Sequence, residues 1–179
     1  MDTEALLVAA KNGDRAALEA LCALFHPRLC RYVYALARSR ETAEDVAQEA
    51  LIAMLRALPK FRGRDARKFE GWLFRIARNQ YFSQARRRRP EPLPEGYDPP
   101  DAAPTPPEAL EGRQRRERVL RALDRLDGEM REMVILRYEM ELSYAQIAAA
   151  MGIGAARVKW RLRDARERLR ALLEGEDMP

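Results

Sequence analysis

Apolar residues recur along this chain of 179 residues at spacings of three and four, which is the period of an amphipathic α-helix. The pattern predicts helices over residues 3–11, 15–38 and 42–58, then a loop over residues 59–68 and a fourth helix from about Phe69 to residue 89. No run of alternating β-branched residues is long enough to predict a strand. We therefore expect an all-α fold.

Residues 143–172 have the pattern of two helices joined by a sharp turn. Ser143 and Gln146 stand three residues apart, the spacing of a capping box that satisfies backbone N–H groups where a helix begins. Gly152 suits the end of that helix, because glycine adopts a positive φ without a Cβ clash. The second helix has one inward stripe, formed by Val158, Leu162, Ala165, Leu169 and Leu172. The pattern predicts a helix-turn-helix unit.

A Pro-rich acidic segment divides the chain. Residues 90–107 hold eight of the eleven prolines, and residues 90–112 contain six acidic residues and no Lys or Arg. Proline at this density excludes a helix or a central strand. We therefore predict two small helical domains, at residues 1–89 and 113–179, joined by an extended linker at 90–112.

Composition excludes several classes of protein. No stretch approaches the roughly 20 apolar residues of a membrane span, and the amino terminus lacks the basic region of a signal peptide, so we expect a cytoplasmic protein without direct membrane insertion. Cys22, Cys30 and the lone His26 cannot complete a four-ligand structural zinc site. With no Gly-rich phosphate loop either, we expect no metal, no cofactor, no catalytic residue and no small-molecule substrate.

Charge points to nucleic acid as a partner. The net charge of +5 is modest, but residues 155–173 hold seven basic and two acidic residues. Residues near the start of a recognition helix reach base edges and later ones contact phosphates. The candidates are Ala155, Ala156, Arg157, Lys159, Trp160, Arg161, Arg163 and Arg166. A solvated helix with pairs such as Arg163 and Glu167 is the alternative. Trp160 suits contact with DNA or packing on a neighbouring helix equally well.

The loop and fourth helix mix aromatic and basic residues, a composition that suits single-stranded nucleic acid. The candidates for such contacts are Phe61, Arg62, Arg64, Arg67, Lys68, Phe69, Trp72, Arg75, Arg78, Asn79 and Arg86. Phe69, Leu73 and Ile76 also have the spacing of core residues, and for these three we favour the core interpretation.

Five motifs occur in a fixed order: AEDVAQEAL at 43–51, FRG at 61–63, WLFRIARN at 72–79, RRRR at 86–89, and LSYAQIAAAMGIGAARVKWRLRDARERLRALL at 142–173. In this arrangement the chain resembles the extracytoplasmic-function (ECF, group IV) sigma factors of bacterial RNA polymerase, small members of the sigma-70 family. The resemblance covers nearly the whole chain. It implies a region 2 helical bundle and a region 4 helix-turn-helix, and a non-catalytic subunit.

The resemblance also assigns roles. Region 2 would dock on the β′ clamp helices of core polymerase through Glu44, Asp45, Gln48 and Glu49, an exposed helix face beside an inward stripe of Ala43, Val46, Ala47, Ala50, Leu51 and Met54. The loop and fourth helix would read and melt the −10 element, with the flipped base held near Arg67, Lys68, Phe69 and Asn79. Region 4 would contact the β flap and read the −35 element as duplex promoter DNA.

Other implications concern regulation and the linker. Many members of the family are held inactive by an anti-sigma factor, so we expect one here. The acidic linker would imitate RNA in the exit channel of the polymerase, or serve as a solubilising spacer. Two rival functions stay open, namely a stand-alone helix-turn-helix regulator and a module whose basic helices bind an acidic protein partner.

Overall fold

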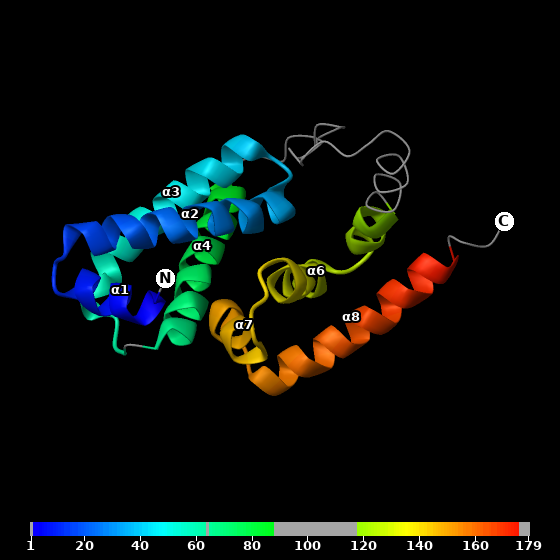
Figure 1. Ribbon diagram of the computed structural model, residues 1–179. Helices are drawn as coiled ribbons and strands as arrows, with labels where there is room; N and C mark the ends of the chain where they lie inside the picture. Colours follow the sequence, from blue (N-terminus) through cyan, green and yellow to red (C-terminus); the bar gives the residue numbers. More distant parts are fainter. Residues whose placement is uncertain (1, 64, 88–117, 176–179) are drawn as a thin grey trace, which may run out of the picture.

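The computed structural model describes residues 2–63, 65–87 and 118–175, and all regular structure within these ranges is helical (Figure 1). The amino-terminal elements are α1 (Thr3–Lys11), α2 (Arg15–Ala37), α3 (Arg40–Ala57), the 3₁₀ turn η1 (Leu58–Lys60) and α4 (Ala66–Arg87). The carboxy-terminal elements are helical residues 118–124, α6 (Gly128–Val134), the π-helical turn η2 (Ile135–Glu139), α7 (Tyr144–Met151) and α8 (Ala155–Gly175). The all-α prediction is confirmed. The predicted linker, residue 64 and residues 88–89 lie outside the described residues.

The amino-terminal helices form a bundle, in which α2 and α3 lie side by side and α4 crosses them (Figure 1). Apolar side chains of all three helices are fully buried between them, among them Leu21, Phe25, Leu29, Val46, Ala47, Leu73 and Phe74. The inward stripe predicted for the third helix is confirmed, since all six of its residues are buried. Each large side chain buried in this way stabilises the fold by about 1.5–3 kcal/mol, so the bundle is a firm support for its outer faces.

Side-chain caps set where these helices begin. The Asp14 carboxylate accepts a hydrogen bond from the Ala17 N–H at 3.2 Å, which confirms the predicted start of α2. The Ser39 hydroxyl accepts one from Thr42 at 3.2 Å, so α3 begins at Arg40 rather than at the predicted residue 42. Asp65 accepts hydrogen bonds from the first turn of α4 at 2.8 and 3.1 Å. The prediction that residues 66–68 belong to a loop is therefore wrong.

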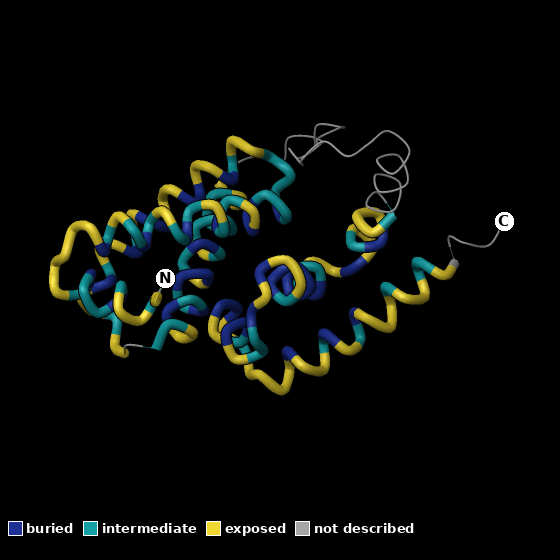
Figure 2. Tube along the Cα trace, viewed as in Figure 1, coloured by how far each residue is buried: buried dark blue, intermediate teal, exposed yellow. Residues whose placement is uncertain are grey.

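The carboxy-terminal half contains the predicted helix-turn-helix. Ser143 and Gln146 form the capping box of α7, and Gly152 ends this helix with a φ of 70°. Val158 and Leu162 of α8 are buried against the preceding helices, while Figure 2 shows that the outer side of α8 is exposed. Among the described helices, none is both long and apolar enough to cross a membrane.

The two halves pack directly on each other through α4 and α7 (Figure 1). Gly71 of α4 makes this contact possible, because a Cβ atom built on it would lie 3.0 Å from the Gln146 carbonyl oxygen and 3.1 Å from the Ala149 Cβ. An added Cβ would have to push these neighbours back by a few tenths of an ångström, so glycine favours this close approach of the two helix backbones. Position 71 therefore sets how tightly the halves close.

Candidate nucleic-acid and polymerase interfaces

The outer side of α4 carries a row of polar and basic side chains. Its exposed members, which we call the α4 stripe, are Lys68, Arg75, Asn79 and Arg86. At the helical turn of about 100° per residue, these four side chains fall within an arc of about 40°. The buried Leu73 and Ala77 lie on the opposite side and anchor the helix in the bundle. The stripe is thus a rigidly supported surface of three cations and one amide, which suits a nucleic-acid backbone and a base edge.

Aromatic rings pack at the start of α4. Phe69 is fully buried, with its ring centroid 5.5 Å from that of Phe25 and 5.6 Å from that of Phe61. Trp72 lies 4.9 Å from Phe61, and both of these rings are only partly buried. The core interpretation is confirmed for Phe69 and Leu73, while Ile76 is half-buried. The buried Phe69 ring therefore packs against the loop residue Phe61. The partly buried rings of Phe61 and Trp72 are the ones that a base can reach.

The loop before α4 is tied to α1. The Lys11 ammonium donates hydrogen bonds to the carbonyl oxygens of Phe61 at 2.8 Å and Gly63 at 3.2 Å. The side chains of Arg62 and Arg67 are exposed beside this anchored segment, whereas Arg64 lies outside the described residues. Lys11 of α1 therefore fixes the backbone of the loop. The sequence analysis did not predict this contact between α1 and the loop.

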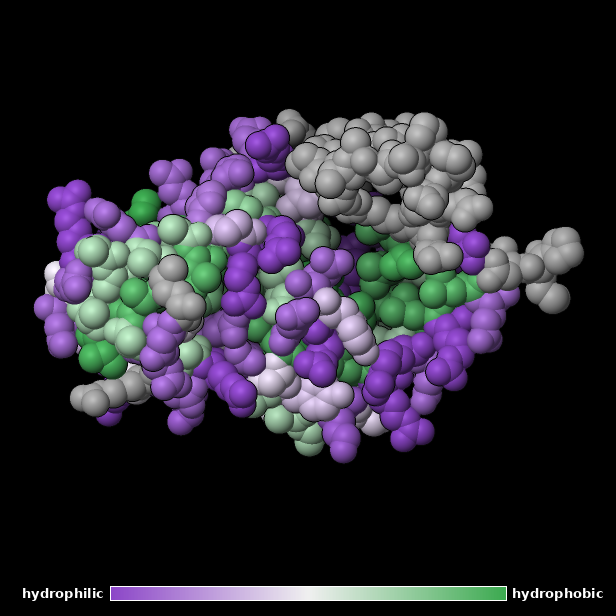
Figure 3. All heavy atoms as spheres, viewed as in Figure 1, coloured by the Kyte–Doolittle hydropathy of each residue, from purple (hydrophilic) through white to green (hydrophobic). Residues whose placement is uncertain are grey.

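The first turns of α8 present a mostly open surface. Its exposed members are Ala155, Ala156, Arg157, Lys159, Trp160, Arg163 and Arg166. The side chain of Trp160 is 62% exposed, so packing on a neighbouring described helix does not account for it. Figure 3 shows hydrophilic side chains gathered along α8. Small residues followed by cations and an exposed indole suit the entry of this helix into a major groove.

Two arginines of α8 bond to acidic residues at the start of α6. Arg157 donates to both carboxylate oxygens of Glu129, at 3.0 and 3.1 Å, and stays largely exposed. Arg161 donates to Glu129 at 2.9 Å and to Asp127 at 3.2 Å, and its side chain is only 19% exposed. Burial tends to raise the pKa of Glu129, but the hydrogen bonds and charges of these arginines outweigh it and lower that pKa. Arg161 therefore orients α8 on α6, while Arg157 can exchange its partner for a base or phosphate.

One side of α3 combines acidic and apolar side chains. Glu44, Asp45, Gln48 and Glu49 are exposed, as the sequence pattern predicted. Ile52 and Leu55 lie on the same side of α3, one and two helical turns after Gln48. Both are among the large apolar residues that are exposed. We call these six residues the α3 face. Sequence reasoning missed its apolar end, although the spacing of seven from Asp45 to Ile52 was a readable signal.

A charged cluster joins the two halves in the interior. Glu132 of α6 is 1% exposed and accepts hydrogen bonds from the Tyr32 hydroxyl at 2.7 Å and from the Arg78 Nε at 2.8 Å. Burial raises the pKa of Tyr32 well above its ordinary value, and the Glu132 charge raises it further, so the hydroxyl keeps its proton. We call these three residues the interdomain cluster. Arg78 was predicted to contact DNA, but in the structure its guanidinium is bonded to Glu132 in this cluster.

Other polar contacts surround this cluster. Arg28 of α2 donates to the Met140 carbonyl oxygen at 2.9 Å and pairs with Glu70, and the Gln146 amide also donates to Glu70. Arg38 pairs with Asp124 at 2.7 Å. The contact between the halves thus combines a close backbone approach with buried and half-buried ion pairs.

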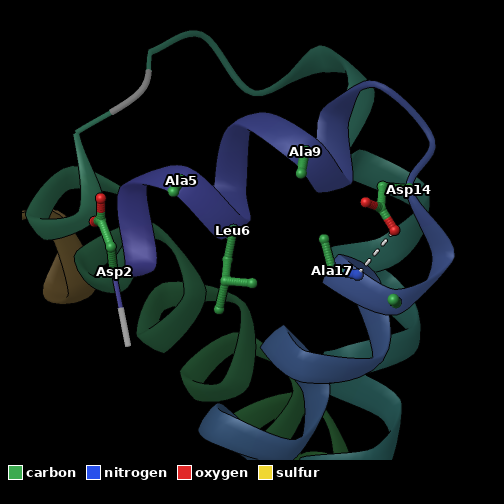
Figure 4. Close-up of a pocket in the computed structure, with 7 residues that line it drawn as sticks. Asp2, Ala5, Leu6, Ala9, Asp14 and Ala17 are labelled. Carbon is green, nitrogen blue, oxygen red and sulfur yellow. Dashed lines mark hydrogen bonds between the residues drawn. The ribbon is translucent and has the colours of Figure 1, made fainter.

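An open hollow of about 440 Å³ lies between α1 and the start of α2 (Figure 4). Its lining consists of Asp2, Ala5, Leu6, Ala9, Asp14, Ala16 and Ala17. The two carboxylates already cap helices, since Asp2 accepts from the Glu4 N–H and Asp14 from the Ala17 N–H. The hollow is therefore lined mostly by apolar side chains, beside two carboxylates that each cap a helix.

Comparison with known proteins identifies the family. The model of sigma-70 region 2 matches residues 21–91, and the model of sigma-70 region 4 matches residues 122–171. The chain is 36% identical over 167 residues to the ECF RNA polymerase sigma factor SigD of Mycobacterium tuberculosis, covering 87% of this chain and 77% of SigD. The chain belongs to the ECF sigma factors of the sigma-70 family.

Further relatives agree with this assignment. The ECF sigma factor SigE of Mycolicibacterium smegmatis is 35% identical over 169 residues, which are 90% of this chain and 65% of SigE, so the chain spans less than two thirds of that relative. The structure of CnrH in complex with the cytosolic domain of CnrY aligns with a TM-score of 0.72 at 26% identity, over 98% of this chain and all of CnrH. RpoE of Bartonella quintana, solved with the anti-sigma factor NepR, aligns with a TM-score of 0.66 at 25% identity, over 87% of this chain and 96% of RpoE.

Within this ECF sigma factor, the α4 stripe and the loop belong to the region 2 match, and α7 with most of α8 belongs to the region 4 match. The interdomain cluster therefore joins region 2 to region 4. The predicted domain limits of 1–89, 90–112 and 113–179 stay a prediction, because residues 88–117 are outside the described part of the chain.

Proposed function

We propose that this ECF sigma factor belongs to group IV and acts in the cytoplasm as the promoter-specificity subunit of bacterial RNA polymerase. It binds the core enzyme, directs it to −35 and −10 elements and takes no catalytic part in RNA synthesis. One observation supports this proposal most strongly. A chain that contains region 2 and region 4 presents basic faces on α4 and α8, and it presents an acidic and apolar face on α3.

Each face has a different partner. The α3 face binds the β′ clamp helices, because its carboxylates suit a basic surface and Ile52 and Leu55 add apolar area at the same contact. The α4 stripe with Phe61 and Trp72 holds the melted −10 strand by cation and stacking contacts. The exposed start of α8 reads the −35 duplex, while region 4 rests on the β flap.

The packed arrangement of the two regions is a resting state. The −35 and −10 promoter elements are, as their numbers indicate, about 25 base pairs apart. At about 3.4 Å per base pair this separation is about 85 Å of duplex. In the structure α7 touches α4, and a Cβ atom at Gly152, just before α8, would lie 3.9 Å from the Arg75 guanidinium. The regions must therefore separate before both elements can be read. Separation also frees Arg78 from Glu132.

We also propose control by an anti-sigma factor. RpoE, whose fold this chain shares, was solved with the anti-sigma factor NepR. A protein that covers the α3 face would keep core polymerase away, and the exposed Ile52 and Leu55 give such a partner an apolar contact.

The experiment is transcription by purified bacterial core polymerase on fragmented genomic DNA, with and without the chain, followed by mapping of transcript 5′ ends. We expect new start sites that share two upstream motifs at one fixed spacing, because linked contacts act together only when their separation suits both. No new start sites, together with sequence-specific duplex binding in the absence of polymerase, would instead establish a stand-alone regulator. Competition by single-stranded −10 DNA separates DNA binding from the binding of an acidic protein.

A further inference from the structure

Three side chains that share no motif converge on the surface where α2 meets α3. His26 and Cys30 stand one helical turn apart on α2, and Glu44 reaches them from α3. The Cys30 Sγ lies 3.7 Å from the His26 Nε2 and 3.5 Å from the Glu44 Oε2, and the His26 Nε2 lies 3.4 Å from the same Glu44 oxygen. One nitrogen, one sulfur and one oxygen atom thus form a compact triangle.

The dimensions of this triangle match one face of a tetrahedral zinc site. With zinc bonds of about 2.05 Å to nitrogen, 2.3 Å to sulfur and 2.1 Å to oxygen, tetrahedral angles separate sulfur from nitrogen or oxygen by about 3.6 Å and nitrogen from oxygen by about 3.4 Å. The three separations in the structure agree with these values to about 0.2 Å. The His26 ring has to turn about its side-chain bonds to aim a nitrogen lone pair at the ion, because the Cys30 Sγ lies almost equally far from Nδ1, at 3.8 Å, and from Nε2, at 3.7 Å.

The helices that carry the ligands are held firmly. Phe25 and Leu29, which alternate with the two ligands on α2, are buried in the core, and so are Val46 and Ala47 beside Glu44 on α3. The ligands themselves are half-buried or exposed, so an ion can reach them from solvent. Because the helices already bring the three groups together, binding of a metal ion requires a side-chain rotation of His26 and no rearrangement of the backbone.

We propose that His26, Cys30 and Glu44 bind one zinc ion. A thiolate and a carboxylate balance the two positive charges, and the neutral imidazole completes a mixed set that suits zinc better than the all-oxygen sets of calcium and magnesium. Three protein ligands leave the fourth position to water or to a ligand from a partner. The site differs from the four-ligand structural type that the sequence argued against, because its third ligand is a carboxylate that lies far from His26 in the sequence.

Zinc has to replace a proton at the thiol. Burial, followed by the charge and the hydrogen bond of Glu44, raises the pKa of Cys30 to about 12. Zinc binding therefore releases this proton. The Glu44 charge that opposes the bare thiolate attracts the cation, so the same group favours the loaded site.

The site adjoins the α3 face, since Glu44 belongs to both. A bound ion engages Glu44 and adds positive charge beside Asp45, so we expect zinc to weaken binding of core polymerase. This consequence rests on the proposed function. Zinc binding itself does not, and it is measured without polymerase.

The test is titration of the reduced full-length chain with Co²⁺ as a spectroscopic stand-in for zinc. We expect a thiolate-to-cobalt charge-transfer band that grows to one equivalent and disappears when Zn²⁺ is added. Cys30→Ser should abolish the band. His26→Ala and Glu44→Gln should each weaken zinc binding by at least about 100-fold, because the loss of a direct ligand costs more than the roughly 10-fold to 100-fold known for outer-shell partners. Circular dichroism verifies that each variant is folded.

Cys22→Ser is the matched control, because Cys22 is the other half-buried free cysteine of α2 and lies outside the ligand cluster. It should leave both the band and the zinc affinity unchanged. Absence of a charge-transfer band in the folded wild-type chain would overturn the proposal. A band that is lost with Cys22→Ser and kept with Cys30→Ser would overturn it equally.

Discussion

The close approach at Gly71 allows a direct test of the packed arrangement, by the substitution Gly71→Leu. The first added carbon would lie 3.0 Å from the Gln146 carbonyl oxygen and 3.2 Å from the Gln146 Cα. Ordinary van der Waals contacts begin near 3.4 Å. Both of these atoms belong to the backbone of α7, so a rotamer change cannot relieve the clash. The remaining leucine carbons add to the overlap.

Two terms set the size of the effect. Overpacking a close interface costs about 1–3 kcal/mol, which opposes the packed state. Leucine favours a helix over glycine by about 0.8 kcal/mol, which stabilises α4 whether or not region 4 is bound to it. The equilibrium between packed and separated regions should therefore shift by about 5-fold to 150-fold toward separation, without unfolding region 2.

Small-angle X-ray scattering measures the result. We expect a larger radius of gyration for Gly71→Leu, unchanged helix content by circular dichroism and, under the proposed function, tighter binding to core polymerase. Gly128→Leu is the control, because no atom lies within 4 Å of a Cβ at this position. A scattering profile of Gly71→Leu that overlays the wild-type profile would refute the reasoning that the packed state depends on this contact.

Three further substitutions address other surfaces. Glu132→Ala should lower the urea midpoint of unfolding or of domain separation by the equivalent of about 1–3 kcal/mol, because it leaves a buried tyrosine hydroxyl unpaired. Asp45→Lys should weaken binding to core polymerase about tenfold or more in a fluorescence titration, whereas Glu19→Lys, on an exposed part of α2, should not. Arg157→Ala should weaken binding to the preferred −35 duplex by about 1–3 kcal/mol and spare unrelated DNA, whereas Arg170→Ala should affect both slightly and equally.

Each of these substitutions can fail in a recognisable way. An unchanged midpoint for Glu132→Ala would mean that the interdomain cluster does not stabilise the packed state. Equal losses for Asp45→Lys and Glu19→Lys would indicate a general charge effect rather than a docking face. An equal loss on all DNA sequences for Arg157→Ala would make this residue a phosphate contact.

The sequence by itself determined the local structure of this protein. The periodicity of apolar residues predicted six of the helices, although not residues 118–124 or α6, and it placed the start of α2 at residue 15. Ser143 and Gly152 predicted where α7 begins and ends. These features depend on partners within about four residues, and such contacts are readable from spacing alone. The error at residues 66–68 arose because Asp65 was not identified as a cap.

The tertiary structure decided which members of a predicted surface are free. Arg78 and Arg161 are basic residues on the same helices as their exposed neighbours, yet they bond to Glu132 and Glu129. The packing of α2 on α3 likewise brings Glu44 next to His26 and Cys30. These partners lie between 14 and 54 residues apart. Helical periodicity orients a side chain on its own helix, but only the packing of helices determines which distant side chain it meets.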